Sequence, residues 1–200
     1  MIRAASVADP LRIAVLASGR GSNLAALLDR LGATVRIVAV ASNRTDAAAL
    51  VRAREAGLET ATFPRGDDPV GRDGRLGDWL VERDVELVVL AGFVELLTPA
   101  LTDRLPIINV HPSLLPAFPG LRAWEQALAA GVGETGVTVH LVDAGLDTGP
   151  IIAQEAVPIR AGDDAAALHE RIQAVEHRLL PAVVLQLAAD AILLPQGATR

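Results

Sequence analysis

The sequence predicts an α/β fold, an open and mostly parallel twisted sheet with helices on both faces, on the strength of three observations. Short runs of β-branched and aliphatic residues alternate along the chain with longer segments rich in Ala, Leu and Arg, which is typical of strands joined by crossover helices. One run, Leu87–Ala91, is apolar on both faces, as expected of a central strand covered by helices on both sides. Hydrophobic residues make up 51% of the 200 residues, so the chain can bury the core of one domain.

The short apolar runs bounded by turn residues predict the strands, in chain order Ile13–Ala17, Val35–Ala41, Glu59–Phe63, Leu87–Ala91, Ile107–Val110, Val137–Val142 and Ile151–Ile159. Apolar residues at helical spacing predict the helices between them, at Asn23–Arg30, Asp46–Ala56, Gly71–Arg83, Thr98–Arg104 and Arg122–Ala130. The last part of the sequence predicts a long helix, Asp163–Ala188, interrupted at Pro181, and a short final strand, Ala191–Leu194.

No repeat or linker divides the chain. The polar stretch Pro64–Asp73 is rich in Gly and Pro, which is typical of a mobile loop rather than of a domain boundary. We therefore expect a single domain over residues 12–195, preceded by a flexible tail at residues 1–11.

Composition excludes several classes of function. The formal net charge is −6, from 18 basic and 24 acidic residues. This acidic balance argues against non-specific nucleic-acid binding, which relies on a basic face. All the basic residues are Arg, and there is no Lys or Cys, which excludes lysine Schiff bases, thiolate nucleophiles and cysteine-bound metals. No apolar run reaches the roughly 18–20 residues of a membrane span. We expect a cytoplasmic protein that acts on small molecules, without a membrane, nucleic-acid or metal partner.

Unusual segments follow several of the expected strands. Ligands of open α/β sheets bind beyond the carboxyl ends of the strands, so functional residues should follow Ala17, Ala91, Val110 and Val142. The first such segment is the glycine loop Ser18–Asn23, which leads into a helix. Its glycines allow a close approach of the backbone to an anion, and the N–H groups at the helix start would face it.

The glycine loop favours a phosphate monoester over a dinucleotide. A dinucleotide fingerprint requires a third Gly and an acid after the second strand, whereas this chain has Leu24 and Ser42-Asn43 there. A turn that only caps the helix is equally compatible with the loop.

A second segment carries a histidine at the end of a strand. Alternation along the strand places Asn109 and His111 on the same side, and Pro112 and Pro116 then direct the chain away from the sheet. An amide beside an imidazole suits acyl transfer, because both can stabilise the oxyanion of a tetrahedral intermediate and the imidazole can move a proton. A simply packed histidine is the alternative.

The third segment is an acidic loop, Asp143–Pro150, after the strand that carries His140. A carboxylate close to His111, such as that of Asp147, would raise the pKa of its imidazole and keep the ring protonated. Asp and Gly also form plain turns, and for Asp143 both interpretations stay open. Chain order allows Asp147 to meet His111 across the sheet.

The run Asn-Val-His-Pro-Ser-Leu-Leu-Pro, followed at this distance by Leu-Asp-Thr-Gly-Pro, is specific to folate-dependent formyl transfer. Five segments carry the likeness in order: Ile13–Leu24, Leu87–Pro99, Asn109–Gly120, Gly136–Pro150 and Val175–His177. Over nearly its whole length the chain resembles the glycinamide ribonucleotide formyltransferases of purine biosynthesis. This resemblance implies their Rossmann-like formyltransferase fold.

The resemblance also implies roles for individual residues. The catalytic trio would be Asn109, His111 and Asp147, with His140 in support. The residues matched to the ribonucleotide are Gly21, Ser22, Asn23 and Glu176. Those matched to the folate are Arg72, Val94, Glu95, Leu96, Leu97, Asn109 and Asp143. Basic residues are frequent in the family where this chain has Glu95, and His or Lys in the segment that here reads Arg122-Ala123-Trp124.

The implied reaction moves the formyl group of 10-formyltetrahydrofolate, as co-substrate, to the amine of 5′-phosphoribosylglycinamide. The products are 5′-phosphoribosyl-N-formylglycinamide and tetrahydrofolate, in de novo purine (IMP) biosynthesis. The implied transfer is direct and needs no metal, since the four His residues are scattered without a ligand pattern. The chain could act as a monomer or a homodimer. The alternatives are a methionyl-tRNA formyltransferase, which would need a further basic domain, a formyltetrahydrofolate hydrolase with an added domain before the catalytic one, and a non-catalytic module that binds nucleotide phosphates.

Overall fold

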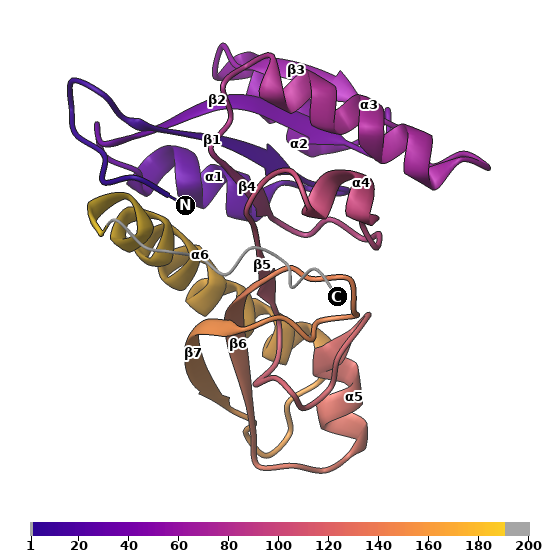
Figure 1. Cartoon of the computed structure of the whole chain (residues 1–200). Coiled ribbons are helices and arrows are strands. Elements are labelled where there is room, and N and C mark those ends of the chain that lie inside the picture. The colour runs from indigo at the N-terminus through magenta and orange to yellow at the C-terminus, as the bar shows by residue number, and fades with distance from the viewer. Residues whose placement is uncertain (1, 191–200) are drawn as a thin grey trace.

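The computed structural model describes residues 2–190 and contains a seven-stranded sheet in the order β3-β2-β1-β4-β5-β6-β7, shown in Figure 1. The strands are β1 (Leu11–Leu16), β2 (Val35–Ser42), β3 (Glu59–Thr62), β4 (Leu87–Leu90), β5 (Ile107–His111), β6 (Glu134–Leu141) and β7 (Ile151–Pro158). The helices are α1 (Ser22–Arg30), α2 (Ala48–Glu55), α3 (Pro69–Val81), α4 (Pro99–Thr102), α5 (Ala123–Ala129) and α6 (Ala165–Ala189). The predicted α/β fold is confirmed.

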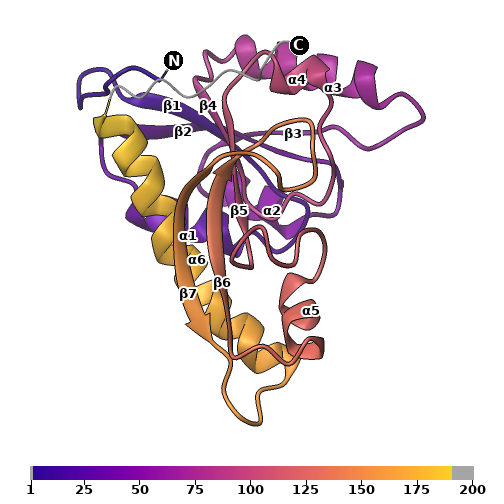
Figure 2. The same ribbon diagram turned by 60° about the horizontal axis from the view of Figure 1, so that its bottom comes forward.

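Alternation along the central strand β1 creates two apolar cores, one on each face of the sheet. Ile13 and Val15 pack with the apolar side chains of α1, α2 and α6, whereas Ala14 and Leu16 pack with those of α3 and α4. Figure 2 shows α6 along one side of the sheet, with α3 and α4 away from it. Helices therefore cover both faces, as the apolar β4 sequence requires.

One strand, β6, runs in the direction opposite to the other six. Strands β1 to β5 are parallel to one another, whereas β6 pairs antiparallel with both β5 and β7. The carboxyl end of β6 therefore lies at the opposite edge of the sheet from that of β5, and the expectation that it shares that edge is wrong. Residues of the loop after β6 reach the site only because the loop turns back.

The segment before β1 packs against the domain, which corrects the expected tail at residues 1–11. Ile2 is 1% exposed, and Ala5 donates its backbone N–H to the carbonyl of Ala188 at 2.8 Å. Arg3 pairs with Glu86, with its Nε 2.8 Å from the carboxylate.

Two expected boundaries are also wrong. Helix α3 begins inside the expected loop Pro64–Asp73, because Pro69 suits the first turn and Asp68 accepts a hydrogen bond from the N–H of Gly71 at 2.8 Å. Helix α6 continues through Pro181, which is buried in the core. The expected strand Ala191–Leu194 lies outside the described residues.

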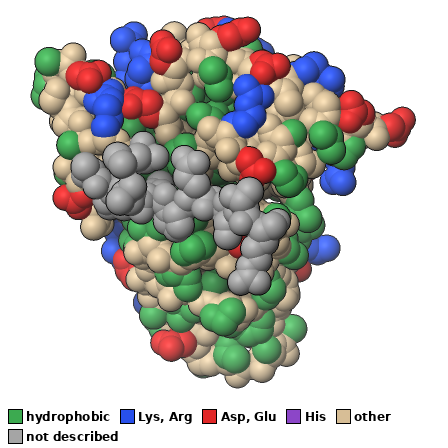
Figure 3. Space-filling view, in the orientation of Figure 1, with side chains coloured by type: hydrophobic (Ala, Val, Ile, Leu, Met, Phe, Trp, Pro, Cys, Tyr) green, Lys and Arg blue, Asp and Glu red, His purple; other side chains and the backbone are tan. Residues whose placement is uncertain are grey.

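The surface in Figure 3 carries acidic and basic side chains side by side over α3 and its neighbouring strands, while the part around α5 shows mostly hydrophobic and uncharged groups. Several of the surface arginines form ion pairs, such as Arg104 with Asp78 at 2.9 Å and Arg83 with Glu59. Within residues 2–190, no helix combines the length and the apolar character that crossing a membrane requires.

Candidate active site

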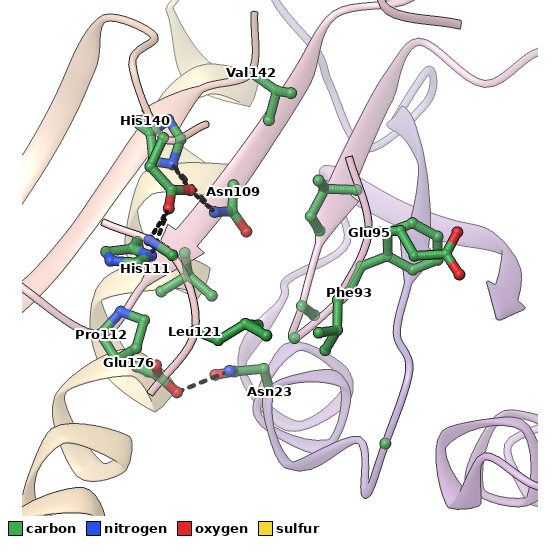
Figure 4. Close-up of a pocket in the computed structure, with 18 of the residues that line it drawn as sticks. Asn23, Phe93, Glu95, Asn109, His111, Pro112, Leu121, His140, Val142 and Glu176 are labelled. Atoms are coloured by element: carbon green, nitrogen blue, oxygen red, sulfur yellow. Dashed lines mark hydrogen bonds and ion pairs between the residues drawn. The ribbon is translucent and has the colours of Figure 1, made fainter. Parts of the chain in front are cut away.

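A cavity of about 700 Å³ opens at the carboxyl ends of β1 and β4, where the strand order reverses. This is where open α/β sheets bind their ligands. Its walls come from the loops after β1, β4 and β6, from the end of β5 and from one face of α6. Side chains far apart in the sequence thus face one space, part of which is shown in Figure 4.

Asn109, His111 and Asp147 meet on one wall of this cavity. The Nδ2 of Asn109 lies 3.5 Å from Oδ1 of Asp147, and the Nδ1 of His111 lies 3.4 Å from Oδ2 of the same carboxylate. Asn109 and His111, both labelled in Figure 4, are on the same side of β5. Asp147 comes from the returning loop after β6. The amide, the imidazole and the carboxylate are therefore within reach of one reacting group.

Asp147 is fixed by its backbone and by two neighbours. It has a left-handed φ of 55°, and its Oδ2 accepts the N–H of Gly120 at 2.8 Å. The ring of His140 faces both partners, with Nε2 3.1 Å from Nδ2 of Asn109 and 3.6 Å from Asp147. His140 thus supports the arrangement from the neighbouring strand β6.

Burial lowers the pKa of His111, the largest influence on this ring, and nearby His140 acts in the same direction. The carbonyl of Phe118, 2.9 Å from Nε2, and the carboxylate of Asp147 act in the opposite direction. Asp147 therefore favours the imidazolium as expected, but burial outweighs it. The expectation of a ring kept protonated by Asp147 is wrong for the free protein.

The carboxylate of Asp147 is itself affected in two ways. Its burial raises the pKa, but hydrogen bonds from His140 and Gly120 and the charge of His111 together bring it below its usual range. Asp147 is thus an anion throughout the neutral pH range, which is the state that can accept hydrogen bonds from its neighbours.

The glycine loop forms the other end of the cavity, through Gly19 to Asn23. Gly21 has φ +73°, and a Cβ there would come within 2.8 Å of the backbone of Ala49. It precedes α1 without a side-chain capping bond. The first N–H groups of α1 have no partner within the helix, so they are available to an anion in the cavity.

Glu176 lies beside this loop and is buried, with 7% of its surface exposed. Nδ2 of Asn23 donates a hydrogen bond to its Oε2 at 2.9 Å, as drawn in Figure 4. Burial raises the pKa of Glu176 to about 7, and the bond from Asn23 offsets only part of the effect. The Oδ1 of Asn23 is buried and has no partner in the described part of the chain.

Glu176→Gln should remove a pH dependence of stability. The carboxyl group has a pKa of 4.5 in the unfolded chain and about 7 when folded, so its stabilising effect is complete below pH 4.5 and is lost as the pH rises through 7. At 1.36 kcal/mol for each pKa unit, the loss is about 3 kcal/mol. Urea unfolding between pH 4.5 and 8 should show the free energy of unfolding of the variant rising relative to that of the wild type by this amount.

The exposed residue Glu170 on the same helix provides the control, because Glu170→Gln removes no buried carboxyl group. Wild-type and Glu176→Gln stabilities that stay parallel over the whole pH range would contradict the burial of an ionisable group here.

The loop after β4 forms an apolar wall. Val94 and Leu96 are exposed to the cavity, while Leu97 is buried behind them. The N–H of Val94 donates to Oγ of Ser18 at 2.9 Å, which joins this wall to the end of β1. Asp143 lines the cavity and also holds its own loop, since it accepts from Gly145 N–H and Thr148 Oγ1 at 3.0 and 2.8 Å.

Arg72 does not reach the cavity, which corrects its expected position at the folate. It is 1% exposed, with Nη1 2.6 Å from Oε2 of Glu95 and Nε 2.6 Å from Oδ1 of Asp73. The second oxygen of Glu95 accepts from Nδ2 of Asn43 at 2.6 Å. Glu95 lines the cavity with this paired carboxylate, which Figure 4 shows turned away from the trio.

Several residues that line the cavity were not among the site residues predicted from the sequence: Arg20, Arg65, Trp124, His169 and Gln173. A signal was present for two of them, since positions 169, 173 and 176 are spaced four and three residues apart and so share one face of α6. A histidine within a long helix is expected on its solvated face, but His169 instead stacks on Trp124. In residues 2–190, no group of three or more His, Asp or Glu is arranged to hold a metal ion.

Known proteins are similar to this chain over most of its length. Residues 11–184 match the family model described as formyl transferase. A phosphoribosylglycinamide formyltransferase of Mycobacterium tuberculosis is 46% identical over 190 residues, covering 92% of this chain and 87% of the relative. The trifunctional purine biosynthetic protein adenosine-3 of Drosophila pseudoobscura pseudoobscura is 45% identical, and its match covers 90% of this chain but only 14% of that protein.

A solved structure gives the same result for the fold. The glycinamide ribonucleotide transformylase 1 of Symbiobacterium toebii superposes with a TM-score of 0.83 at 44% identity, covering 90% of this chain and 88% of that one. The family model spans β1 to α6 and includes all three members of the trio. The chain belongs to the formyl transferase family.

Proposed function

We propose that the chain transfers the formyl group of 10-formyltetrahydrofolate to the amine of 5′-phosphoribosylglycinamide. The names of its relatives support this reaction, and one geometric observation carries it. The side chains of Asn109, His111 and Asp147, from two separate segments, converge on the wall of a cavity that also contains a glycine loop at a helix start. Such a cavity offers a place for a reacting carbonyl and a separate place for a phosphate.

The transfer is direct. The amine attacks the formyl carbon and forms a C–N bond, and the formyl oxygen becomes an oxyanion in the tetrahedral intermediate. Asn109 donates a hydrogen bond to this oxyanion, in the manner of an oxyanion-hole amide. Cleavage of the bond to N10 of the folate then releases tetrahydrofolate, after a proton has moved from the amine to N10.

His111 moves that proton. Burial lowers the pKa of His111, so the ring can accept a proton from the attacking amine. The carbonyl of Phe118 and the carboxylate of Asp147 are both acceptors at its two nitrogens, and only the imidazolium donates to both. The ring is thus stabilised in the protonated form that it holds while the oxyanion exists.

The two ends of the cavity suit the two substrates. Gly21, Ser22 and Asn23 bind the phosphate through N–H groups at the start of α1, and Glu176 lies next to them. At the other end, the exposed apolar side chains of Val94 and Leu96 face the cavity together with Leu146. Clustered exposed apolar groups are typical of a ligand groove, and this one suits the rings of a folate.

The absorbance change on deformylation of the folate tests the proposal, measured with and without the ribonucleotide. Turnover that requires the ribonucleotide supports the transferase. Turnover without it would instead identify a formyltetrahydrofolate hydrolase. An absence of turnover in both, with ribonucleotide binding intact, would identify a non-catalytic phosphate-binding module.

Asp147→Asn should lower activity at neutral pH. The charge of Asp147 raises the pKa of His111, so its removal lets that pKa fall further and disfavours the imidazolium. The inflection of kcat/KM that reports His111 should move to lower pH. A pH–rate profile identical to that of the wild type would remove Asp147 from the mechanism.

We also propose that the chain acts as one catalytic domain in the cytoplasm and forms a homodimer. Light scattering tests the assembly, since a homodimer has twice the 20.8 kDa mass of the chain. A mass of one chain at assay concentrations would overturn the homodimer and leave the proposed reaction untouched.

A further inference from the structure

Two aromatic rings stack in the wall of the cavity. The rings of Trp124 and His169 lie 4.0 Å apart with an angle of 1° between their planes. Trp124 comes from α5 and His169 from α6, and both line the cavity. Stacking on the larger indole fixes the plane of the imidazole, whose nitrogens bond to no other side chain or backbone group of residues 2–190.

Arg20 adds a cation beside this stack. It belongs to the glycine loop between β1 and α1, is exposed and lines the same cavity. No carboxylate in the described part of the chain pairs with it, whereas Arg122 at the start of α5 pairs with Glu125 at 3.3 Å. Burial lowers the pKa of His169, and the positive charge of Arg20 contributes to this, so the two groups are close enough to affect each other.

The glycine loop also contributes a buried polar atom, Oδ1 of Asn23, without a hydrogen-bond partner in the part of the chain that the structure describes. Asn23 is 7% exposed, and its Oδ1 is buried without a hydrogen-bond partner among residues 2–190. A buried polar atom without a partner is costly. Because Oδ1 is an acceptor, the group that satisfies it must be a donor such as a sugar hydroxyl. The groups here that suit an anion are the guanidinium of Arg20, unpaired within residues 2–190, and the imidazole of His169 fixed by stacking.

We propose that Arg20 and His169 bind the phosphate of the ribonucleotide and determine the preference for it over the unphosphorylated riboside. Arg20 supplies a charged fork of N–H donors, which suits a phosphate dianion. His169 supplies an N–H from α6, and Trp124 is a positioning residue that holds the imidazole. The inference rests on the proposed function, and it adds to the glycine loop two side-chain contacts from separate elements.

The test compares kcat/KM for 5′-phosphoribosylglycinamide with that for the corresponding glycinamide riboside. A hydrogen bond to a charged group is worth enough that its loss lowers affinity about ten-fold or more. Arg20→Gln and His169→Asn should each raise KM for the ribonucleotide by about this factor, with little change in kcat, in the riboside constants or in KM for the folate. Arg20→Lys should restore part of the loss.

Trp124 is tested by rescue. Trp124→Ala should raise KM for the ribonucleotide, and Trp124→Phe should restore it, because a smaller ring still stacks on His169. The matched controls are Arg52→Gln, an exposed arginine of α2 outside the cavity, and His177→Asn on α6, also outside it. Both controls should keep the wild-type preference.

The outcomes separate this inference from the proposed function. A wild-type protein that does not formylate the ribonucleotide contradicts the proposed function and, with it, the inference. A wild-type protein that does so, with an unchanged preference for the ribonucleotide in Arg20→Gln and His169→Asn, overturns the inference alone. Inorganic phosphate should compete with the ribonucleotide in the wild type and compete more weakly in both variants.

Discussion

Asn109→Ala is expected to lower kcat by about 10²–10³-fold, the usual cost of losing one oxyanion donor. Of the three side chains of the trio, Asn109 alone brings an uncharged amide donor, and its Nδ2 lies 3.1 Å from His140 and 3.5 Å from Asp147. Because the oxyanion exists only in the intermediate, KM for both substrates should change little. Steady-state kinetics with each substrate varied in turn measures the effect.

His111→Ala should lower kcat at least as much, because it removes the group that moves the proton. Circular dichroism and thermal unfolding establish that both variants remain folded. His177→Ala replaces a histidine outside the cavity and should keep wild-type turnover. Near-wild-type turnover in both Asn109→Ala and His111→Ala would show that the reaction occurs elsewhere.

The pairing of Asn109 with His111 could be predicted from the sequence, because the two-residue period of a strand places them on one side. The approach of Asp147 could not. Antiparallel β6 ends at the far edge of the sheet, and Asp147 returns through a loop with a left-handed φ and a bond from Gly120. Chain order indicates neither the strand direction nor the path of such a loop.

The protonation state expected for His111 is wrong for a related reason. A carboxylate nearby predicts a raised pKa, and Asp147 does act in that direction. Burial acts in the other direction and prevails, and the extent of burial depends on everything packed around the ring. A sequence motif identifies the partner of a titratable group but not the solvent around it.

Arg72 is the clearest case of a residue whose type is informative and whose location is not. An exposed arginine on a loop would suit a carboxylate of a bound ligand. Helix α3 begins earlier than expected, at Pro69, and turns Arg72 into the core beside Asp73 and towards Glu95. The acid at position 95, where a basic residue is frequent in the resembling family, acts here as the ion-pair partner of Arg72.

Arg72→Met is expected to destabilise the fold by about 3–5 kcal/mol, the usual cost of removing one partner from a buried ion pair. The side chains of Asp73 and Glu95 are 0% and 8% exposed, so both carboxylates would lose their countercharge away from water. Urea unfolding at pH 7 measures the loss. Arg36→Met, at an exposed position of β2, should cost little.

A variant with both ionic partners changed distinguishes a buried charge from lost packing. Arg72→Met with Glu95→Gln leaves only Asp73 charged, so it should regain part of the stability lost by Arg72→Met alone, which simple loss of packing would not predict.

The ion pairs of Arg72 also hold the apolar wall of the cavity. Glu95 precedes Leu96 and Leu97 in this wall, and Asp73 accepts the N–H of Thr98 at 2.6 Å. A wall held from both ends in this way should shift when Arg72 is replaced, and KM for the folate should then rise while KM for the ribonucleotide stays unchanged. Equal changes in both constants would mean that the ion pair supports the domain as a whole and not this wall.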